Sequence, residues 1–557
     1  MIRVTRVAAA GASWVAAWLV ARRLSGAPGI VPRLFAPASL DAPAPGFVAV
    51  NRAFRSEFRA RCFWCVLADV LSLDWSLSRL RRINNHDERL NLFETALPDE
   101  SLRWIAAHAN VAAWAAQYDG AALRRDLCPP PRATTVERFV LLAKGQPAWT
   151  ARLDLIRGAR RKLLVQYAYI YLDNYGWAFC TELAAAADRG VDVEVMIDEF
   201  GAESFNFGEE SPHHPCRPDG QRSTWDDMMR LLLDAGVSVT YWRGLSTVEG
   251  KEFATKNHTK TLIADDRVAI LGDRNIGSEY FDTWAGADIL VVGDAARALS
   301  RSFVDDMAPY LVPCPTPPTT TTSVSGRTAV PPAPAGQLEA SLAAYDALYP
   351  LAGINSESES GSTMAAEVLV HLPSTHGYDP ILHRIIAAVR SATTSVDIRS
   401  CYMLLARALQ DELVAASQRG VAVRFVTNSA RTNDLLFIHT AMCESLIAPV
   451  EAGAVALFAT KAMDHTKFIV VDKRWICVGS WNCWLRTHFY EAETNVVVDD
   501  AAMGERLVRE EIDDVTRDEL IESGEIAVYT AQMLKHEADA VSARLGHRGD
   551  AFSAMFI

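Results

Sequence analysis

Short apolar runs follow the same order in the two halves of this 557-residue chain. In each half an alanine-rich, helix-like segment leads to an Arg-Gly-Val sequence, at residues 189–193 and 419–423, and then to an apolar run. Two later runs, at residues 262–264 and 468–471, have the composition of buried strands. Strands alternating with helices at this spacing predict an α/β fold in which helices cover a largely parallel sheet, and the fold occurs twice.

The N-terminal hydrophobic segment has a different pattern. Two arginines precede an uncharged, mostly apolar run at residues 7–21, and two more close it. The run is shorter than the roughly 20 apolar residues that cross a bilayer, and near the length of a signal-peptide apolar region. We interpret residues 1–25 as an uncleaved hydrophobic membrane anchor or signal anchor; a cleaved signal peptide and an ordinary buried helix are the alternatives. The predicted localisation is membrane-associated, at an inner membrane or on its exported side.

Composition divides the rest of the chain into four parts. Residues 50–145 are predicted to form an N-terminal helical region, because residues 102–118 are apolar and alanine-rich. The two predicted lobes are residues 146–312 and residues 364–557. Between them, residues 313–363 are rich in proline, threonine and serine and bury too little apolar surface to offset chain entropy. We interpret this segment as a linker or insertion, with shielding or gating of a site as the alternative.

One polar motif occurs in both predicted lobes with the same spacing. A histidine is followed by a lysine two residues later, an aspartate after seven and an asparagine after seventeen. The two sets are His258, Lys260, Asp265 and Asn275, and His465, Lys467, Asp472 and Asn482. If His-x-Lys lies on a strand, both side chains point to the same side, because side chains alternate along a strand. A single match is usually just a polar strand position, whereas two in register indicate a shared function.

These residue types suit the cleavage of a phosphodiester. Imidazole is a good nucleophile near neutral pH and also acts there as a general acid or base. Of two facing histidines, one would attack phosphorus, while the other protonates the leaving alcohol and later deprotonates the acceptor. Lysine supplies charge and asparagine an amide donor for the oxygens of a pentacoordinate phosphorus. The doubled motif therefore predicts an enzyme that works through a phosphohistidine.

Each half also offers a carboxylate that could hold a histidine in one tautomer. The candidates are Asp288 and Glu493, which both precede apolar, β-branched runs that are typical of strands. Asp265 and Asp472 are expected at strand ends before a turn, where we interpret them as structural. Ser480, in the Gly-Ser-Trp-Asn sequence of the second motif, is also assigned a structural role.

No metal and no cofactor are expected at the motifs. Histidine and aspartate seven residues apart, without further His or Cys at ligand spacing, do not make a zinc site, and the neighbouring lysine would repel a cation. The Cys-x-x-Cys at residues 62–65 has no second pair at zinc spacing. The net charge of −13 argues against a nucleic-acid binder that contacts phosphates over a broad surface.

The paired motifs, each followed by a Gly-x-x-Asn sequence, resemble the phospholipase D superfamily, also called HKD enzymes. The flanking sequences are similar to bacterial cardiolipin synthases over about residues 145–312 and 365–515. The segments that carry this similarity are residues 159–171, 187–198, 272–281, 419–434 and 479–486. The resemblance implies two lobes around a pseudo-twofold axis, each a sheet covered by helices on both faces, with the two motifs at the interface.

The resemblance also implies that His258 is the nucleophile and His465 the acid/base, which the residues alone do not distinguish. One position departs from the family pattern. Residue 273 is Asp, where these families usually carry Gly or Ser. A carboxylate close to a phosphate is unfavourable unless it points away from it.

The predicted function is that of a phosphatidyltransferase of the cardiolipin synthase type, acting on phospholipid phosphodiesters. The alternative keeps the two histidines and uses water as the acceptor, which gives a phospholipase D hydrolase or a nucleic-acid phosphodiesterase. A third class, a non-catalytic scaffold, is disfavoured because both copies keep His, Lys and Asn. The expected partners are a phospholipid substrate and the membrane surface, with no broad nucleic-acid binding and no obligate protein partner.

Overall fold

The computed structural model describes most of the two predicted lobes. The described residues are 131–198, 223–242, 256–307, 311–313, 363–372, 379–435 and 438–545. The predicted anchor at residues 1–25, most of the predicted helical region at 50–145 and most of the predicted linker at 313–363 lie outside these ranges. Within them, no helix combines the length and the apolar character that crossing a membrane requires.

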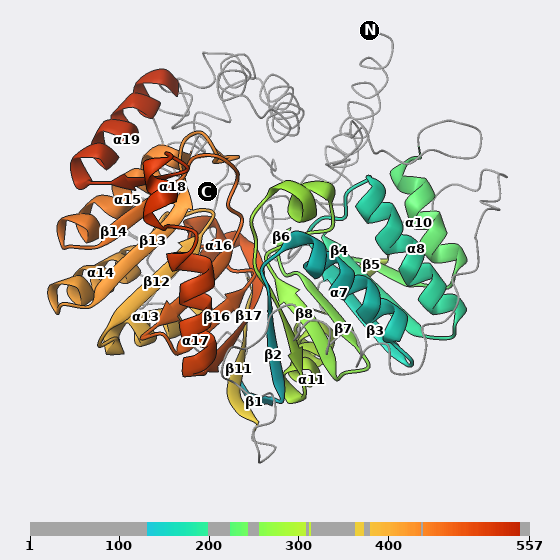
Figure 1. The fold of residues 1–557 in the computed structure, drawn as a ribbon. Helices are drawn as coiled ribbons and strands as arrows, with labels where there is room; N and C mark the ends of the chain where they lie inside the picture. The colour runs from blue at the N-terminus through green and yellow to red at the C-terminus, as the bar shows by residue number, and fades with distance from the viewer. Residues whose placement is uncertain are drawn as a thin grey trace, which may run out of the picture.

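Each lobe is an α/β layer built on one sheet, and the two lobes lie side by side (Figure 1), so the predicted fold class is confirmed. The eight strands of the first sheet are, in spatial order, β10 (Leu311–Pro313), β5 (Ser238–Trp242), β4 (Asp192–Asp198), β3 (Lys162–Tyr167), β7 (Thr261–Ala264), β8 (Val268–Gly272), β9 (Asp288–Val292) and β2 (Arg138–Leu142). The ten strands of the second sheet are β1 (Arg132–Val136), β11 (Met364–His371), β17 (Glu491–Asp499), β16 (Trp475–Gly479), β15 (Lys467–Val471), β12 (Ser395–Ser400), β13 (Ala422–Asn428), β14 (Val455–Ala459) and β18 (Ile526–Tyr529), with β6 (Lys256–Asn257) paired to β17.

Helices cover the outer face of each sheet, and the inner faces enclose a shared middle layer. The outer helices are α7 (Gly145–Gly158), α8 (Asn174–Asp188) and α10 (Trp225–Asp234) in the first lobe, and α13 (Pro380–Ser391), α14 (Arg407–Gln418), α15 (His439–Glu451) and α19 (Ala531–Leu545) in the second. The middle layer contains α11 (Asp294–Arg301) and α17 (Ala501–Val508). The remaining short elements are α16 (Leu485–Tyr490), α18 (Asp518–Glu522) and the π-helical turns η4 (Glu279–Thr283), η5 (Ser302–Asp306) and η8 (Arg509–Asp513).

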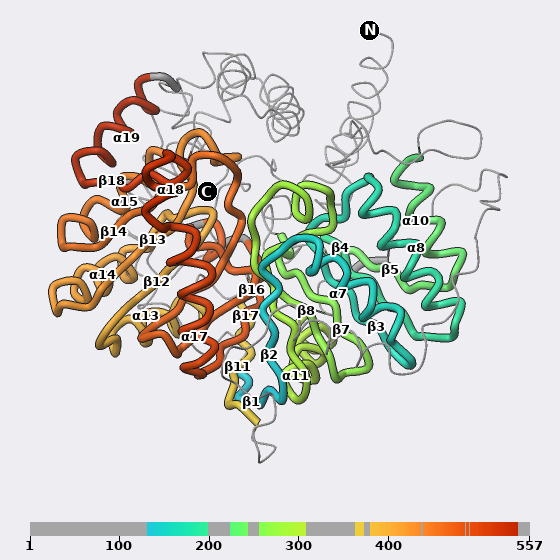
Figure 2. Tube along the Cα trace, in the orientation of Figure 1, coloured from blue at the N-terminus to red at the C-terminus, as the bar shows by residue number. Residues whose placement is uncertain are grey.

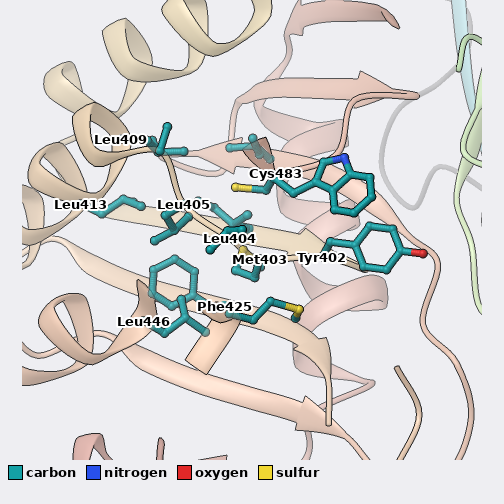
Figure 3. Packing of buried hydrophobic residues seen from close by; sticks show 14 of the residues in the cluster. Tyr402, Met403, Leu404, Leu405, Leu409, Leu413, Phe425, Leu446 and Cys483 are labelled. Atoms are coloured by element: carbon teal, nitrogen blue, oxygen red, sulfur yellow. The ribbon is translucent and has the colours of Figure 1, made fainter. Parts of the chain in front are cut away.

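Three hydrophobic cores correspond to these layers. One lies under the outer helices of each lobe, and the third lies between the two sheets and contains residues from both lobes. Figure 3 shows part of the second-lobe core, where Leu409 and Leu413 of α14 lie with Leu446 of α15 near Phe425 of β13. The shared third core makes the lobes one packed unit rather than two separate domains, because its apolar surface is buried only when both sheets are present.

The sheets are less parallel than the sequence predicted. Among neighbouring strands, β3–β4–β5 and β12–β13–β14 are parallel, as is the short β6–β17 pair; the other described ladders are antiparallel. The turn from β7 to β8 has Asp265 and Asp266 at φ 55° and 58°, and the turn from β15 to β16 has Asp472 and Lys473 at φ 52° and 53°. Two consecutive left-handed residues make a tight hairpin, which leaves no chain for a crossover helix. The prediction of a largely parallel sheet is therefore wrong.

The repeated Arg-Gly-Val sequence ends a helix in each lobe, α8 in the first and α14 in the second. Gly190 and Gly420 follow these helices with φ of 89° and 88°, a conformation that costs glycine little. The amides of Val191 and Val421 then donate to carbonyls in the last helical turn, at 3.1 Å in both cases. The repeat thus stops the helix and directs the chain into the next parallel strand.

Two strands at the start of the described chain join both sheets. β1 pairs with β11 in the second sheet, and β2 pairs with β9 in the first. Their sequences, RATTV and RFVLL, are rich in the β-branched and apolar residues that favour strands. The prediction of a helical region up to residue 145 is wrong for this segment, and the first sheet already includes residues before the predicted lobe boundary at 146.

Candidate active site

The two motifs meet at the seam between the lobes, and each one is docked on the opposite lobe. The amide of His258 donates to the carbonyl of Ala492 at 2.9 Å, and the amide of His465 donates to the carbonyl of Ala285, also at 2.9 Å. A short parallel pairing accompanies each bond, one of them between β6 and β17. Figure 2 traces the chain through the two lobes on either side of this seam. Because backbone bonds fix both histidines, their positions depend on the contact between the lobes.

The imidazole of His258 is held by a carboxylate from the other lobe. Its Nδ1 lies 2.9 Å from Oε1 of Glu493, and both side chains are buried. Burial lowers the pKa of His258 well below its usual value, and the positive charges of Lys260 and Lys467 lower it further. Burial also raises the pKa of Glu493, with Glu491 adding to the shift. Both shifts favour the uncharged forms of the two groups; when Nδ1–H donates to Glu493, Nε2 keeps a free electron pair.

The imidazole of His465 is surrounded by groups from both lobes. Lys467 Nζ lies 3.2 Å from its Nδ1 and 3.3 Å from its Nε2. Oδ1 of Asp273, from the first lobe, lies 3.7 Å from Nδ1. The ring of Trp284 stacks on the imidazole with centroids 5.6 Å apart, and Tyr280 meets it edge-on at 5.2 Å. The first lobe therefore supplies both the aromatic rings and a carboxylate beside the histidine of the second lobe.

The two motif lysines turn back toward their own histidines. Lys260 Nζ donates to the carbonyl of His258 at 2.5 Å, and Lys467 Nζ donates to the carbonyl of His465 at 2.8 Å. Neither His-x-Lys triplet lies wholly on a strand, because Lys260 precedes β7 and Lys467 is the first residue of β15, so the expected placement of both side chains on one side by strand alternation stays a prediction. Burial, together with Lys467, lowers the pKa of Lys260 to about 7, against the opposing pull of Glu493. The site gathers more positive charge than it can keep ionised without an anion.

The motif asparagines are buried and oriented by neighbours. Asn275 Oδ1 accepts from the amide of Tyr169 at 3.1 Å, and its Nδ2 donates to the hydroxyl of Tyr280 at 2.9 Å. Asn482 Oδ1 accepts from the thiol of Cys401 at 3.0 Å. Bonds to both amide oxygens fix which end of each side chain carries the donors.

A seam of two histidines and two lysines from repeated halves is the arrangement of a known family. The sequence model of the family described as "Cardiolipin synthase, PLD-like domain" matches residues 153–306 and 385–513, about half of the chain. The chain belongs to the phospholipase D superfamily. It is an enzyme of the phosphatidyltransferase or phosphodiesterase type.

Relatives of the chain cover most of its length. Cardiolipin synthase 2 of Staphylococcus epidermidis is 21% identical over 400 residues, which are 71% of each chain. A cardiolipin synthase of Staphylococcus aureus is 22% identical over 388 residues, which are 69% of this chain and 68% of that one. Among solved structures, phosphatidylserine synthase of Haemophilus influenzae has a similar fold, with a TM-score of 0.54 at 15% identity over 80% of this chain and 100% of that one.

Asp288 has a different environment from the one that the sequence predicted for this phospholipase D-type site. Its Oδ2 accepts from Arg152 Nη2 at 2.9 Å and from Arg274 Nη1 at 3.1 Å, and its Oδ1 accepts from the amide of Arg274 at 3.3 Å. Its recorded partners are arginines rather than a histidine, and the expectation that it holds one is wrong. Glu493 does bind a histidine, but that histidine is His258 of the opposite lobe.

The three motif residues with predicted structural roles bind the backbone. Asp265 accepts from the amides of Arg160, Arg161 and Lys162, at 2.8–3.0 Å. Asp472 accepts from three consecutive amides, those of residues 393–395, at 2.7–3.0 Å. Ser480 Oγ accepts from the amide of Thr494 at 3.1 Å. The two aspartates tie each hairpin turn to the start of the neighbouring strand.

Sequence reasoning missed several residues at the seam, among them Trp284, Tyr280 and Glu491. Glu491 accepts from the side chains of Trp484, Arg486 and Thr487, at 2.9–3.1 Å. Together with His258 and Glu493 it brings three possible metal-ligand atoms within 4.8 Å of one another. The donors already bound to Glu491, and the charge of Lys260, make this cluster a poor cation site. Asp273 was noticed as a departure, but nothing in its own motif indicates that it faces His465.

Proposed function

We propose that this chain is a phosphatidyltransferase of the cardiolipin synthase type that works through a covalent phosphohistidine. The observation that carries the proposal is that the backbone of each lobe binds the motif histidine of the opposite lobe, which brings both histidines to the seam. Two buried histidines have separate carboxylate neighbours, Glu493 for one and Asp273 for the other, and a lysine beside each. Two histidines in different environments can take different roles, one as nucleophile and one as acid/base.

His258 is the proposed nucleophile. Its depressed pKa keeps the imidazole uncharged at neutral pH, and Glu493 at Nδ1 directs the electron pair to Nε2. In the first step the Nε2–phosphorus bond forms and the bond from phosphorus to the leaving alcohol breaks. His465 gives its proton to the departing oxygen.

The second step reverses the roles. His465, now neutral, takes the proton of an incoming hydroxyl, whose oxygen attacks phosphorus while the Nε2–phosphorus bond breaks. Lys260, Lys467 and the motif asparagines are proposed to hold the phosphoryl oxygens in both steps. An anionic phosphodiester at the seam would raise the pKa of Lys260 from about 7, because a negative charge favours the ammonium form.

The proposed substrate is a phospholipid, and the proposed acceptor is the hydroxyl of a second phospholipid. The names of the relatives, cardiolipin synthase and phosphatidylserine synthase, support a phosphatidyl donor. We further propose association with a membrane surface, in keeping with the apolar run at residues 7–21. Water as acceptor, giving a phospholipase D, is the alternative outcome. The net charge of −13 disfavours nucleic acid as the substrate.

A product assay distinguishes these reactions. The purified full chain receives phosphatidylglycerol in mixed micelles, alone or with phosphatidylethanolamine, and products are identified by mass spectrometry. The proposal expects cardiolipin from the wild type and none from His258→Ala or His465→Ala. Phosphatidic acid without cardiolipin would identify water as the acceptor. No lipid turnover by folded protein would reject a phospholipid substrate and direct the search to other phosphodiesters.

A trapping experiment tests the covalent step. Phosphohistidine is labile to acid and acyl esters are labile to alkali, so a denaturing quench at neutral pH followed by intact-protein mass spectrometry should detect a phosphatidyl increment. The increment should be absent in His258→Ala; in His465→Gln, which slows both steps, it should form more slowly and also decay more slowly than in the wild type. An increment that persists in His258→Ala and disappears in His465→Gln would reverse the assignment of the nucleophile.

A further inference from the structure

The carboxylate that Glu493 supplies to His258 has no counterpart at the matching position of the first lobe. His258 binds the carbonyl of Ala492, and Glu493 is the next residue; His465 binds the carbonyl of Ala285, and the next residue is Gly286. Gly286 therefore has the same relation to His465 that Glu493 has to His258, and it carries no side chain.

Strand register gives the same correspondence independently. In the first lobe Gly272 of β8 pairs with Asp288 of β9, and in the second lobe Gly479 of β16 pairs with Asn495 of β17. Asp288 thus corresponds to Asn495 and not to Glu493. An acid two residues further along the strand keeps the same face but lies farther from the seam, by about 7 Å.

Asp273 corresponds to Ser480, because each follows the paired glycine. Oδ2 of Asp273 accepts from the amide of Ala287 at 2.6 Å, as Oγ of Ser480 accepts from the amide of Thr494 at 3.1 Å. The longer side chain leaves a second oxygen. Oδ1 is buried, has no hydrogen-bond partner among the described residues, and lies 3.7 Å from Nδ1 of His465.

The space at Gly286 explains why the two changes occur together. A Cβ at residue 286 would lie 2.5 Å from Oδ1 of Asp273 and 3.0 Å from Cζ of Arg274. The carboxylate of Asp273 therefore occupies the room that an acidic side chain at 286 would need. The second lobe has the pair Ser480 and Glu493, whereas the first lobe has Asp273 and Gly286.

We propose that Asp273 is the positioning residue of His465, a carboxylate that has moved from the end of strand β9 to the end of strand β8. The assignment rests on the proposed two-histidine reaction. Asp273 combines the two contacts that Ser480 and Glu493 make separately in the second lobe. One of its oxygens binds the backbone amide, and the other faces Nδ1 of the acid/base histidine.

Charged groups surround both Asp273 and His465. His465 faces Lys467 two residues further along the chain, His258 across the seam, and the rings of Trp284 and Tyr280. Asp273 is influenced by Arg274, Lys467 and Asp464. Burial raises the pKa of Asp273, while Arg274 and Lys467 oppose the shift. The separation of 3.7 Å, against 2.9 Å for His258 and Glu493, makes this the looser of the two pairs.

A transposition experiment tests the proposal with Asp273→Ser, Gly286→Glu and the double variant, which copies the second lobe. We expect Asp273→Ser to lower kcat about tenfold or more, as loss of an orienting carboxylate does. Gly286→Glu alone should also be impaired, because two carboxylates compete for one space. The double variant should exceed Asp273→Ser in kcat by at least about threefold, because an orienting carboxylate is restored. Asp273→Asn, which keeps the shape without the charge, covers the case in which Asp273→Ser does not fold.

A second readout does not require turnover. In protein labelled with 13C at histidine Cε1, the His465 resonance is assigned with His465→Gln and titrated by NMR without lipid. Losing the carboxylate of Asp273 should lower the pKa of His465 by about one unit, and Gly286→Glu in the double variant should restore it. A shifted titration without lipid turnover would retain the pairing and reject the proposed substrate. An unchanged titration in folded Asp273→Ser and Asp273→Asn, or a double variant no better than Asp273→Ser, would overturn the proposal.

Discussion

Asp288 and Glu493 both precede an apolar, β-branched run, but the structure predicts that replacing Asp288 lowers stability, whereas replacing Glu493 lowers activity. Asp288 is fully buried and binds two arginines, Arg152 at 2.9 Å and Arg274 at 3.1 Å, which are themselves only 1% exposed. Asp288→Asn leaves two buried guanidinium groups without a counter-charge. Breaking a buried ion pair by removing one partner costs about 3–5 kcal/mol, or roughly 4–8 °C in Tm for a single unit formed by both lobes.

The assay is thermal unfolding followed by tryptophan fluorescence at several scan rates, so that irreversible unfolding is recognised. Lipid turnover is measured at 20 °C on the folded fraction. Asp288→Asn should lower Tm strongly while kcat stays within about twofold, since the carboxylate does not face the reacting groups. Glu493→Gln should lower Tm less than Asp288→Asn does and lower kcat about a hundredfold or more, because an amide can donate to Nδ1 of His258 and hold the ring in the wrong tautomer.

A control separates buried from exposed ion pairs. Glu367 binds Arg384 through two bonds at 2.7 and 2.8 Å, but these side chains are 27% and 41% exposed. Glu367→Gln should therefore cost less than about 1 kcal/mol. If Asp288→Asn is no less stable than Glu367→Gln, or if its kcat falls as far as that of Glu493→Gln, the structural assignment of Asp288 is wrong.

Three further outcomes follow from the structure. Lys260 has a pKa of about 7 and is charged below that pH, so kcat/KM of the wild type should fall as pH rises through about 7. In Lys260→Arg this decline should move to higher pH, because arginine keeps its charge. An unchanged pH profile in Lys260→Arg would show that Lys260 does not bind the phosphate. The backbone amides that Asp472 binds lower its pKa to about 2, so the stability that its carboxylate gives the fold is complete above about pH 4 and lost toward pH 2. Asp472→Ala should lower the free energy of unfolding by about 1–2 kcal/mol at pH 7. This difference from the wild type should shrink as the pH is lowered. Gly190→Ala and Gly420→Ala should each cost about 1 kcal/mol through φ alone, since nothing lies within 4 Å of either added Cβ, and unfolding in urea should show the two costs to be additive.

Much of the architecture could be predicted from sequence because the signals were local and repeated. The duplicated motif indicated that two histidines share one site, and the Arg-Gly-Val repeat was expected to follow a helix, where the structure adds that Gly190 and Gly420 have left-handed φ. The prediction of a largely parallel sheet was wrong because it extended the strand–helix–strand spacing of the Arg-Gly-Val repeat to the strands on either side of Asp265 and Asp472. Two residues with positive φ instead close a hairpin.

The carboxylate pairing was harder to predict, because it depends on register across the seam. Glu493 follows its motif histidine by 28 residues, whereas Asp288 follows His258 by 30. Counting from the histidines would have shown that residue 286, a glycine, is the true counterpart. Even this count does not say which lobe each acid serves, since only the pairing of β6 with β17 carries Glu493 to His258. The Asp at position 273, which departs from the family pattern, was the visible sign in the sequence that the carboxylate has a different position in the first lobe.

The bonds from His258 to Ala492 and from His465 to Ala285 have a mechanical consequence. Separating the two lobes would break the backbone hydrogen bonds that orient both imidazoles, so we expect an opened molecule to be inactive. Many enzymes capture substrate by bending at a hinge between domains; in this chain a bend that opens the seam would cost both of these bonds, so the contact between the lobes is itself part of what keeps the two histidines in position.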